Sequence, residues 1–122
     1  MLADPPTTLY GLGSTRLLID LEELHPGVAI VGARRASAYG RDVAYQFGRD
    51  LAAAGMTIVS GMALGVDGAA HRGALSVRGR TIAVLAGGPD RPYPPSHRRL
   101  YEQLISDGAV ISERPPGARA RR

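Results

Sequence analysis

The stretch Val59–Leu75, VSGMALGVDGAAHRGAL, decides which fold this sequence predicts. It begins at the end of an apolar segment, Thr57–Gly61, whose β-branched residues and final glycine predict a buried strand. Beyond Gly65 it enters a helical segment, from about Val66 to Val77, which we expect Gly79 to close. A strand, a glycine-rich turn and a helix in this order are typical of one unit of a parallel α/β sheet.

The same unit recurs on both sides of this stretch. The patterns predict strands at Val28–Gly32, Thr81–Gly88 and Ala109–Glu113, and helices from about Tyr39 to Ala54 and from Ser96 to about Ser106. Glycines 55 and 108 are expected to end these two helices. We predict an α/β fold: a Rossmann-like three-layer αβα domain with a mainly parallel sheet covered by helices on both faces.

Smaller features complete this prediction. Leu9–Gly13 is expected to add an edge strand, and a short helix should carry Leu17, Leu18, Leu21 and Leu24. In the helix from Tyr39, the four-residue spacing predicts a core-facing side made of Val43, Phe47, Leu51 and Ala54. Small residues of the next helix, Ala69, Ala70, Gly73 and Ala74, should let it approach the sheet closely.

Composition narrows the class of protein. A chain of 122 residues suits one small domain, and zero cysteines exclude disulfides and thiolate chemistry. No secretory signal or membrane span is visible, so we expect a cytoplasmic protein. All 15 basic residues are arginines, and the net charge is +4. This balance favours polyanionic partners, because the planar guanidinium binds oxyanions in a bidentate way, but it also fits a GC-rich genome.

In open α/β sheets, ligands bind beyond the carboxyl ends of the strands. The first such loop, GARRAS, places Gly32, Arg34, Arg35 and Ser37 before a helix, which is typical of an anion cradle. Neither GxGxxG nor the P-loop pattern is present there. The alternative is a glycine turn with two surface arginines.

The second loop offers Ser60, Gly61 and Gly65 as backbone or hydroxyl contacts. Asp67 and His71 lie four residues apart on one helix face, either as an acid–base pair or, as we favour, as a structural pair that shapes the loop. Two such side chains do not define a metal site, and we expect no metal.

The third loop, AGGPDRPYP, contributes Gly87 and Gly88 for close backbone approach. Tyr93 between prolines could stack on a base or pack beneath the loop. Arg98 and Arg99 follow on the next helix, either as phosphate contacts or as solvated side chains.

These blocks, in this order, resemble the DNA-processing protein A family, DprA or Smf. The similarity lies in ADPPTTLYGLG, VAIVGARRASAYG, VSGMALGVDGAAHRGAL, GRTIAVLAGGPDRPYPPSHRRL and DGAVISERPPG, from about Asp4 to Gly117. The resemblance implies single-stranded DNA binding and loading of RecA recombinase in natural transformation and recombination. It implies no enzyme activity and no cofactor, and it suggests a homodimer.

Carried over residue by residue, the resemblance makes Arg34 a phosphate contact. Ala33 replaces a serine of the family pattern, and Pro95 and His97 depart from it after Tyr93. The family continues with an FP.RNR block and further elements, so we expect residues 1–117 to form an incomplete core domain and residues 118–122 a disordered basic tail.

Two other functions remain open. One is a nucleotide-binding or LOG-type phosphoribohydrolase domain, although the PGGxGTxxE signature of that group is absent. The other is a fragment whose sheet is completed by another chain.

Overall fold

The computed structural model describes residues 10–14, 17, 26–32, 37–61, 65–85, 98–112 and 117. They form five strands, β1 (Tyr10–Gly13), β2 (Gly27–Ala29), β3 (Thr57–Ser60), β4 (Arg80–Val84) and β5 (Ala109–Ser112), and three helices, α2 (Ala38–Ala53), α3 (Val66–Ser76) and α4 (Arg98–Asp107). The predictions for Leu18, Leu21, Leu24, Ser96 and residues 118–122 lie outside the described residues. In the described part of the chain, no helix has the length and apolar character needed to cross a membrane.

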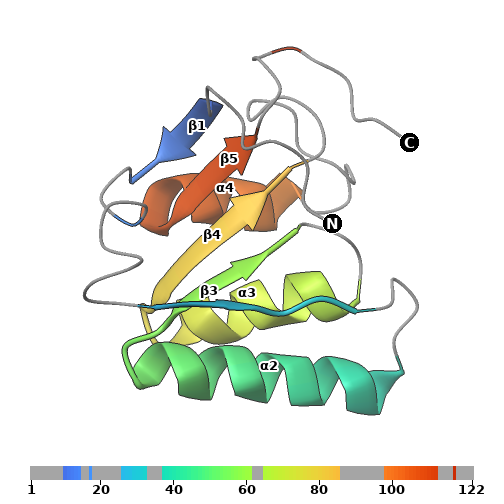
Figure 1. Cartoon of the computed structure of the whole chain (residues 1–122). Coiled ribbons are helices and arrows are strands. Elements are labelled where there is room, and N and C mark those ends of the chain that lie inside the picture. Colours follow the sequence, from blue (N-terminus) through green and yellow to red (C-terminus); the bar gives the residue numbers. More distant parts are fainter. Residues whose placement is uncertain are drawn as a thin grey trace, which may run out of the picture.

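The sheet has the strand order β1-β5-β4-β3-β2 (Figure 1). Strands β2 to β5 are parallel, with Val28 beside Ile58, Val59 beside Ile82 and Ala83 beside Val110. β1 pairs with β5 in the antiparallel direction, so the predicted edge strand is confirmed. The predicted α/β class with a mainly parallel sheet is confirmed, although β2 is shorter than the predicted Val28–Gly32.

The three helices pack against one face of the sheet. Each crossover from β2 to β5 moves one strand further in the same direction, and right-handed crossovers then place every helix on the same side. Ile58 packs with Ala52, Ala70 and Ala74 there, and Ala83 and Val110 pack with side chains of α3 and α4. The opposite face is contacted by Leu17, which packs with Ile82 and Ala109.

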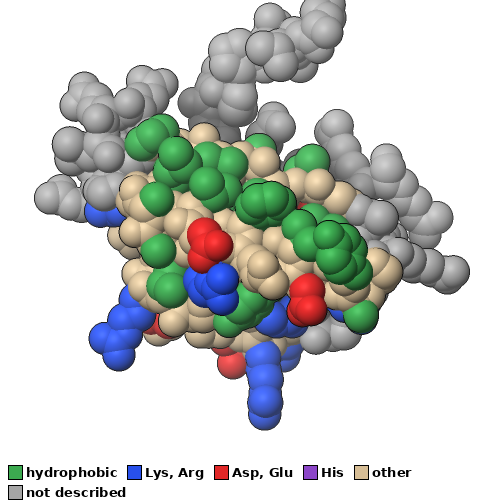
Figure 2. Space-filling view, turned by 90° about the horizontal axis from the view of Figure 1, so that it is seen from below, with side chains coloured by type: hydrophobic (Ala, Val, Ile, Leu, Met, Phe, Trp, Pro, Cys, Tyr) green, Lys and Arg blue, Asp and Glu red, His purple; other side chains and the backbone are tan. Residues whose placement is uncertain are grey.

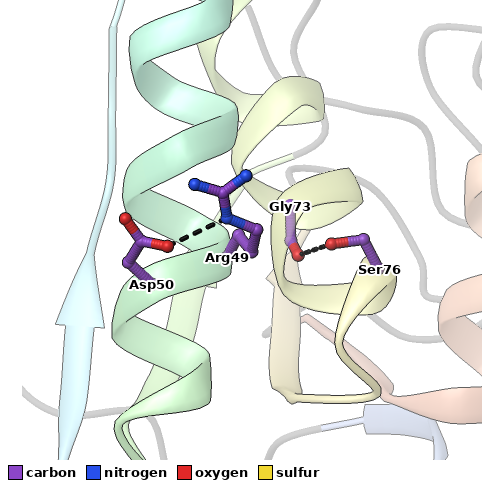
Figure 3. Close-up of polar contacts among 4 residues, drawn as sticks. All are labelled: Arg49, Asp50, Gly73 and Ser76. Carbon is purple, nitrogen blue, oxygen red and sulfur yellow. Dashed lines mark hydrogen bonds and ion pairs between the residues drawn. The ribbon is translucent and has the colours of Figure 1, made fainter.

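Helices α2 and α3 approach one another until their backbones touch. A methyl group on Gly48 would lie 2.2 Å from the Ala70 carbonyl oxygen, and one on Gly73 would lie 2.0 Å from the Tyr45 carbonyl oxygen. Figure 3 shows Gly73 on the side of α3 that faces α2. The sequence predicted an approach of α3 to the sheet, which Ala70 and Ala74 make. For Gly73 that prediction was wrong, because its close neighbour is a helix.

The prediction of the buried face of α2 was also wrong, because the buried positions are shifted by one residue along the helix. The buried positions are Ala44, Gly48 and Ala52. Phe47 is 58% exposed and Tyr39 79% exposed. Figure 2 shows hydrophobic side chains at the surface of the molecule in the view from below. Leu51 only partly reaches the core, and Ala54 is exposed. Close contact with α3 selects the smallest side chains and leaves the larger ones at the margin.

Helices α2 and α3 end in the same way, in a Schellman motif. In α2 the left-handed residue is Gly55, as predicted, and the Met56 N–H donates to the Leu51 carbonyl at 3.1 Å. In α3 the Gly79 N–H donates to the Ala74 carbonyl at 2.9 Å, but the left-handed residue is Arg78, with φ of 53°. Gly79 instead gives room to Ala52, whose Cβ would lie 2.4 Å from an added methyl group.

Replacing Gly73 by alanine should destabilise the fold by at least about 1–3 kcal/mol, because the overpacked helices must separate. Chemical denaturation monitored by circular dichroism measures this change. The control is Arg72→Ala, on the neighbouring exposed position of α3, which should change stability by less than about 0.5 kcal/mol. Equal stability of the two variants would contradict the backbone contact between α2 and α3.

The conformations at the two helix ends predict that substitutions there change stability in opposite directions. Arg78→Gly should raise the free energy of unfolding by up to about 1 kcal/mol, because glycine adopts the left-handed conformation without strain. Gly55→Ala should lower it by about 1 kcal/mol for the same reason. Urea midpoints of both variants test the pair, and a destabilised Arg78→Gly variant would contradict it.

Candidate functional site

The carboxyl ends of β2, β3 and β4 share one edge of the sheet, because these strands are parallel. Helices α2, α3 and α4 each follow one of these strands, so all three begin at this edge, as the ribbon shows for α2 and α3 (Figure 1). Free N–H groups and the positive dipole end at a helix start attract anions. We refer to this edge as the ligand edge; its described residues are 30–32, 60, 61, 65 and 98.

The first loop of the ligand edge is anchored at both ends. Gly32 lies against α3, and a methyl group on it would come within 2.8 Å of the Val66 side chain. Ser37 is the N-cap of α2, where its Oγ accepts the Gly40 N–H at 3.0 Å. Gly32 and Ser37 therefore have structural roles that the sequence did not predict. Ala33, Arg34 and Arg35 lie between them in sequence, outside the described residues.

In the second loop, the Ser60 side chain is turned inward. It is buried, and its Oγ donates a short hydrogen bond to the Ile30 carbonyl, which ties the end of β3 to the end of β2. Gly65 is the N-cap of α3 and has a φ of 81°, a conformation that favours glycine. The hydroxyl that the sequence assigned to a ligand thus holds two strand ends together.

His71 is fully buried between α3 and the sheet. Its Nε2 lies 2.6 Å from the Gly61 carbonyl oxygen, and its Nδ1 lies 2.6 Å from Thr81 Oγ1. Asp67, one turn earlier on α3, is also buried. A ring with both nitrogens engaged inside the protein fits the structural role that the sequence favoured over acid–base chemistry.

At the start of α4, the Arg98 side chain is 73% exposed. Its Nε lies 3.4 Å from Oε1 of Glu102, one turn further along the helix. Such an exposed pair contributes little to stability and leaves the guanidinium available to solvent and ligands. The other candidates of the third loop, Gly87, Gly88 and Tyr93, lie outside the described residues. Within the described part of the chain, no group of three or more His, Asp or Glu side chains could hold a metal ion.

A different arginine marks the opposite end of the helices. Arg49, toward the end of α2, donates from Nε to Asp50 at 2.9 Å (Figure 3). The hydrogen bond that Arg49 donates to Asp50, and then the charge of Asp50, raise the pKa of Arg49. Arg49 therefore remains a cation, and it lies toward the end of α2 that is away from the ligand edge.

Thr81 is the residue of this region that sequence reasoning missed. It is the second residue of β4, where a β-branched residue is expected, and only the packing of α3 onto the sheet brings its hydroxyl to His71. No spacing in the sequence connects residues 71, 81 and 61.

Two serines allow a matched test of the ligand edge. Ser60→Ala should lower stability by about 1–3 kcal/mol, because it removes a buried donor from the Ile30 carbonyl. Ser76→Ala removes an exposed hydroxyl that donates to the Gly73 carbonyl at 2.6 Å (Figure 3), and should cost less than about 0.5 kcal/mol. Thermal unfolding measures both, and equal costs would contradict the proposed tie between β2 and β3.

Comparison with known sequences matches residues 1–122 to the family of DNA recombination-mediator protein A. A DprA relative from Mycobacterium tuberculosis (strain ATCC 25618 / H37Rv) is 46% identical over 118 residues. These cover 96% of this chain but 29% of the relative. DNA processing protein DprA of Bacillus subtilis (strain 168) is 35% identical over 113 residues, covering 93% of this chain and 37% of that protein. The chain thus spans less than two thirds of these relatives.

Two solved structures share the fold. DNA processing protein A from Helicobacter pylori, described for its single-stranded DNA binding mode, matches with a TM-score of 0.84 and 35% identity. This match covers 99% of this chain and 53% of that one. DprA from Streptococcus pneumoniae matches with a TM-score of 0.87 and 36% identity, over 99% of this chain and 41% of that one. Sequence and structure together assign this chain to the DNA recombination-mediator protein A family.

Proposed function

We propose that the ligand edge binds single-stranded DNA through its phosphates, without sequence specificity. The observation that carries this proposal is the likeness, over 99% of the chain, to the H. pylori protein described for single-stranded DNA binding. The start of three helices at one edge supports it, because each start adds N–H donors for phosphate oxygens. The cationic balance of the chain also favours a polyanion.

Within this proposal, Arg34 and Arg35 provide the positive charge that binds the phosphates. They lie in sequence between Gly32, which packs on α3, and Ser37, which caps α2. A loop held at both ends presents its side chains at lower entropic cost than a free one. Arg98 at the start of α4 is a further phosphate contact, and Tyr93 is a stacking platform for a base.

The wider role follows from the family. We propose that the chain acts in DNA processing in the cytoplasm, as a binding module rather than an enzyme, and serves the loading of RecA on single strands. A nucleotide-binding role for the same edge is the competing hypothesis. A single experiment with two ligands separates them.

Fluorescence anisotropy with a labelled oligo-dT should show saturable binding that weakens steeply with salt. Arg34→Ala should lower the affinity about tenfold, for the loss of one charge-assisted hydrogen bond of about 1.5 kcal/mol. It should also reduce the slope of log affinity against log salt by about 0.7. Arg49→Ala, which removes an arginine toward the end of α2 that lies away from the ligand edge, is the matched control and should bind like wild type.

The outcomes are distinct. Competition by a mononucleotide at similar concentration would favour the nucleotide-binding hypothesis. Equal losses for Arg34→Ala and Arg49→Ala would show that general charge, rather than the ligand edge, carries the binding. A folded chain that does not bind oligo-dT would overturn the proposed function for this chain.

A further inference from the structure

We propose that His71 is the positioning residue of the ligand edge, acting through the Gly61 carbonyl, with Thr81 orienting the imidazole ring. This inference rests on the proposed function for its DNA-binding readout. His71 has no exposed surface, so it cannot touch a ligand itself. Any effect it has on binding must pass through the backbone that it holds.

The hydrogen-bond chemistry gives each ring nitrogen one role. A carbonyl oxygen has no proton, so the 2.6 Å contact with Gly61 requires the proton to be on Nε2. In the neutral ring, Nδ1 then accepts the hydroxyl proton of Thr81, also at 2.6 Å. Without the Thr81 hydroxyl, the ring would lose the Nδ1 contact to β4 that orients Nε2 toward Gly61.

The peptide that His71 holds lies at a junction. Gly61 is the first residue after β3, and Ser60 just before it is already tied to the Ile30 carbonyl. Gly65 then starts α3 with a positive φ. The direction in which the chain leaves β3 is therefore determined on one side by Ser60 and on the other by His71. The glycine itself imposes no preference, because it lacks a Cβ.

This arrangement couples the interior to the surface. The imidazole bridges the end of β3 and the start of β4 from within the core, so the backbone at the ligand edge follows the placement of α3 on the sheet. Losing the Nε2 donor should leave the core largely apolar and packed while releasing the Gly61 peptide. Binding at this edge should then suffer more than folding does.

The experiment compares pairs of variants in the full chain. His71→Gln keeps an N–H donor at a similar reach, and His71→Leu removes it. Thr81→Ser keeps the hydroxyl, and Thr81→Val removes it. Oligo-dT affinity is measured by anisotropy well below each unfolding midpoint, and hydrogen exchange of the Gly61 and Gly65 amides is measured by NMR.

We expect His71→Leu and Thr81→Val to lose at least fivefold in affinity and to exchange the two amides at least tenfold faster. His71→Gln and Thr81→Ser should remain within about twofold of wild type, a rescue expected from hydrogen bonds worth about 1 kcal/mol. Should His71→Leu fail to fold, the Thr81 pair decides the question alone.

Folded variants without a donor that match wild type in affinity and exchange would overturn the inference. A glutamine variant as impaired as the leucine variant would also overturn it, because packing rather than the donor would then matter. If wild type itself does not bind oligo-dT, the proposed function fails, and the exchange rates decide the positioning role on their own.

Discussion

The contact between the backbones of α2 and α3 is the constraint on which the rest of the structure depends. Neighbouring strands lie about 4.8 Å apart, whereas packed helices are usually separated by about 8–10 Å. Three consecutive crossovers on one face force helices to follow strands at a spacing too narrow for them. Gly48 and Gly73 relieve this conflict, because each removes the side chain at the point of closest approach. The starts of α2 and α3 are thereby brought together at the ligand edge.

Buried polar groups then determine the shape of that edge. Ser60, His71 and Thr81 are all buried, and their side chains bond to one another or to backbone carbonyls of loops that leave the sheet. Such bonds are strong in a low-dielectric interior and costly to break there. The edge is therefore held from inside by side chains that do not reach the surface. Among the described residues of the stretch Val59–Leu75, only Arg72 is exposed.

The structure brings together strand-end residues that the sequence grouped, and it gives two of their serines hydrogen bonds within the protein. Loops after consecutive strands must share an edge in any parallel sheet, so Gly32, Ser60 and Gly65 were correctly grouped. Ser60 and Ser37 were expected to offer hydroxyls to a ligand, but one ties two strands and the other caps α2. A serine that contacts a ligand and a serine that stabilises the fold look alike in the sequence. Only the direction of the side chain in the folded protein distinguishes them.

The sequence by itself determined the order of strands and helices, the parallel class of the sheet and the helix end at Gly55. These follow from local periodicity and from the conformational freedom of glycine, which act within a few residues. Only the tertiary structure decided that Phe47 lies at the surface, that Arg78 rather than Gly79 takes the left-handed conformation, and that Thr81 meets His71. Each depends on how closely one element packs on another, and that distance is determined by side chains far apart in the chain.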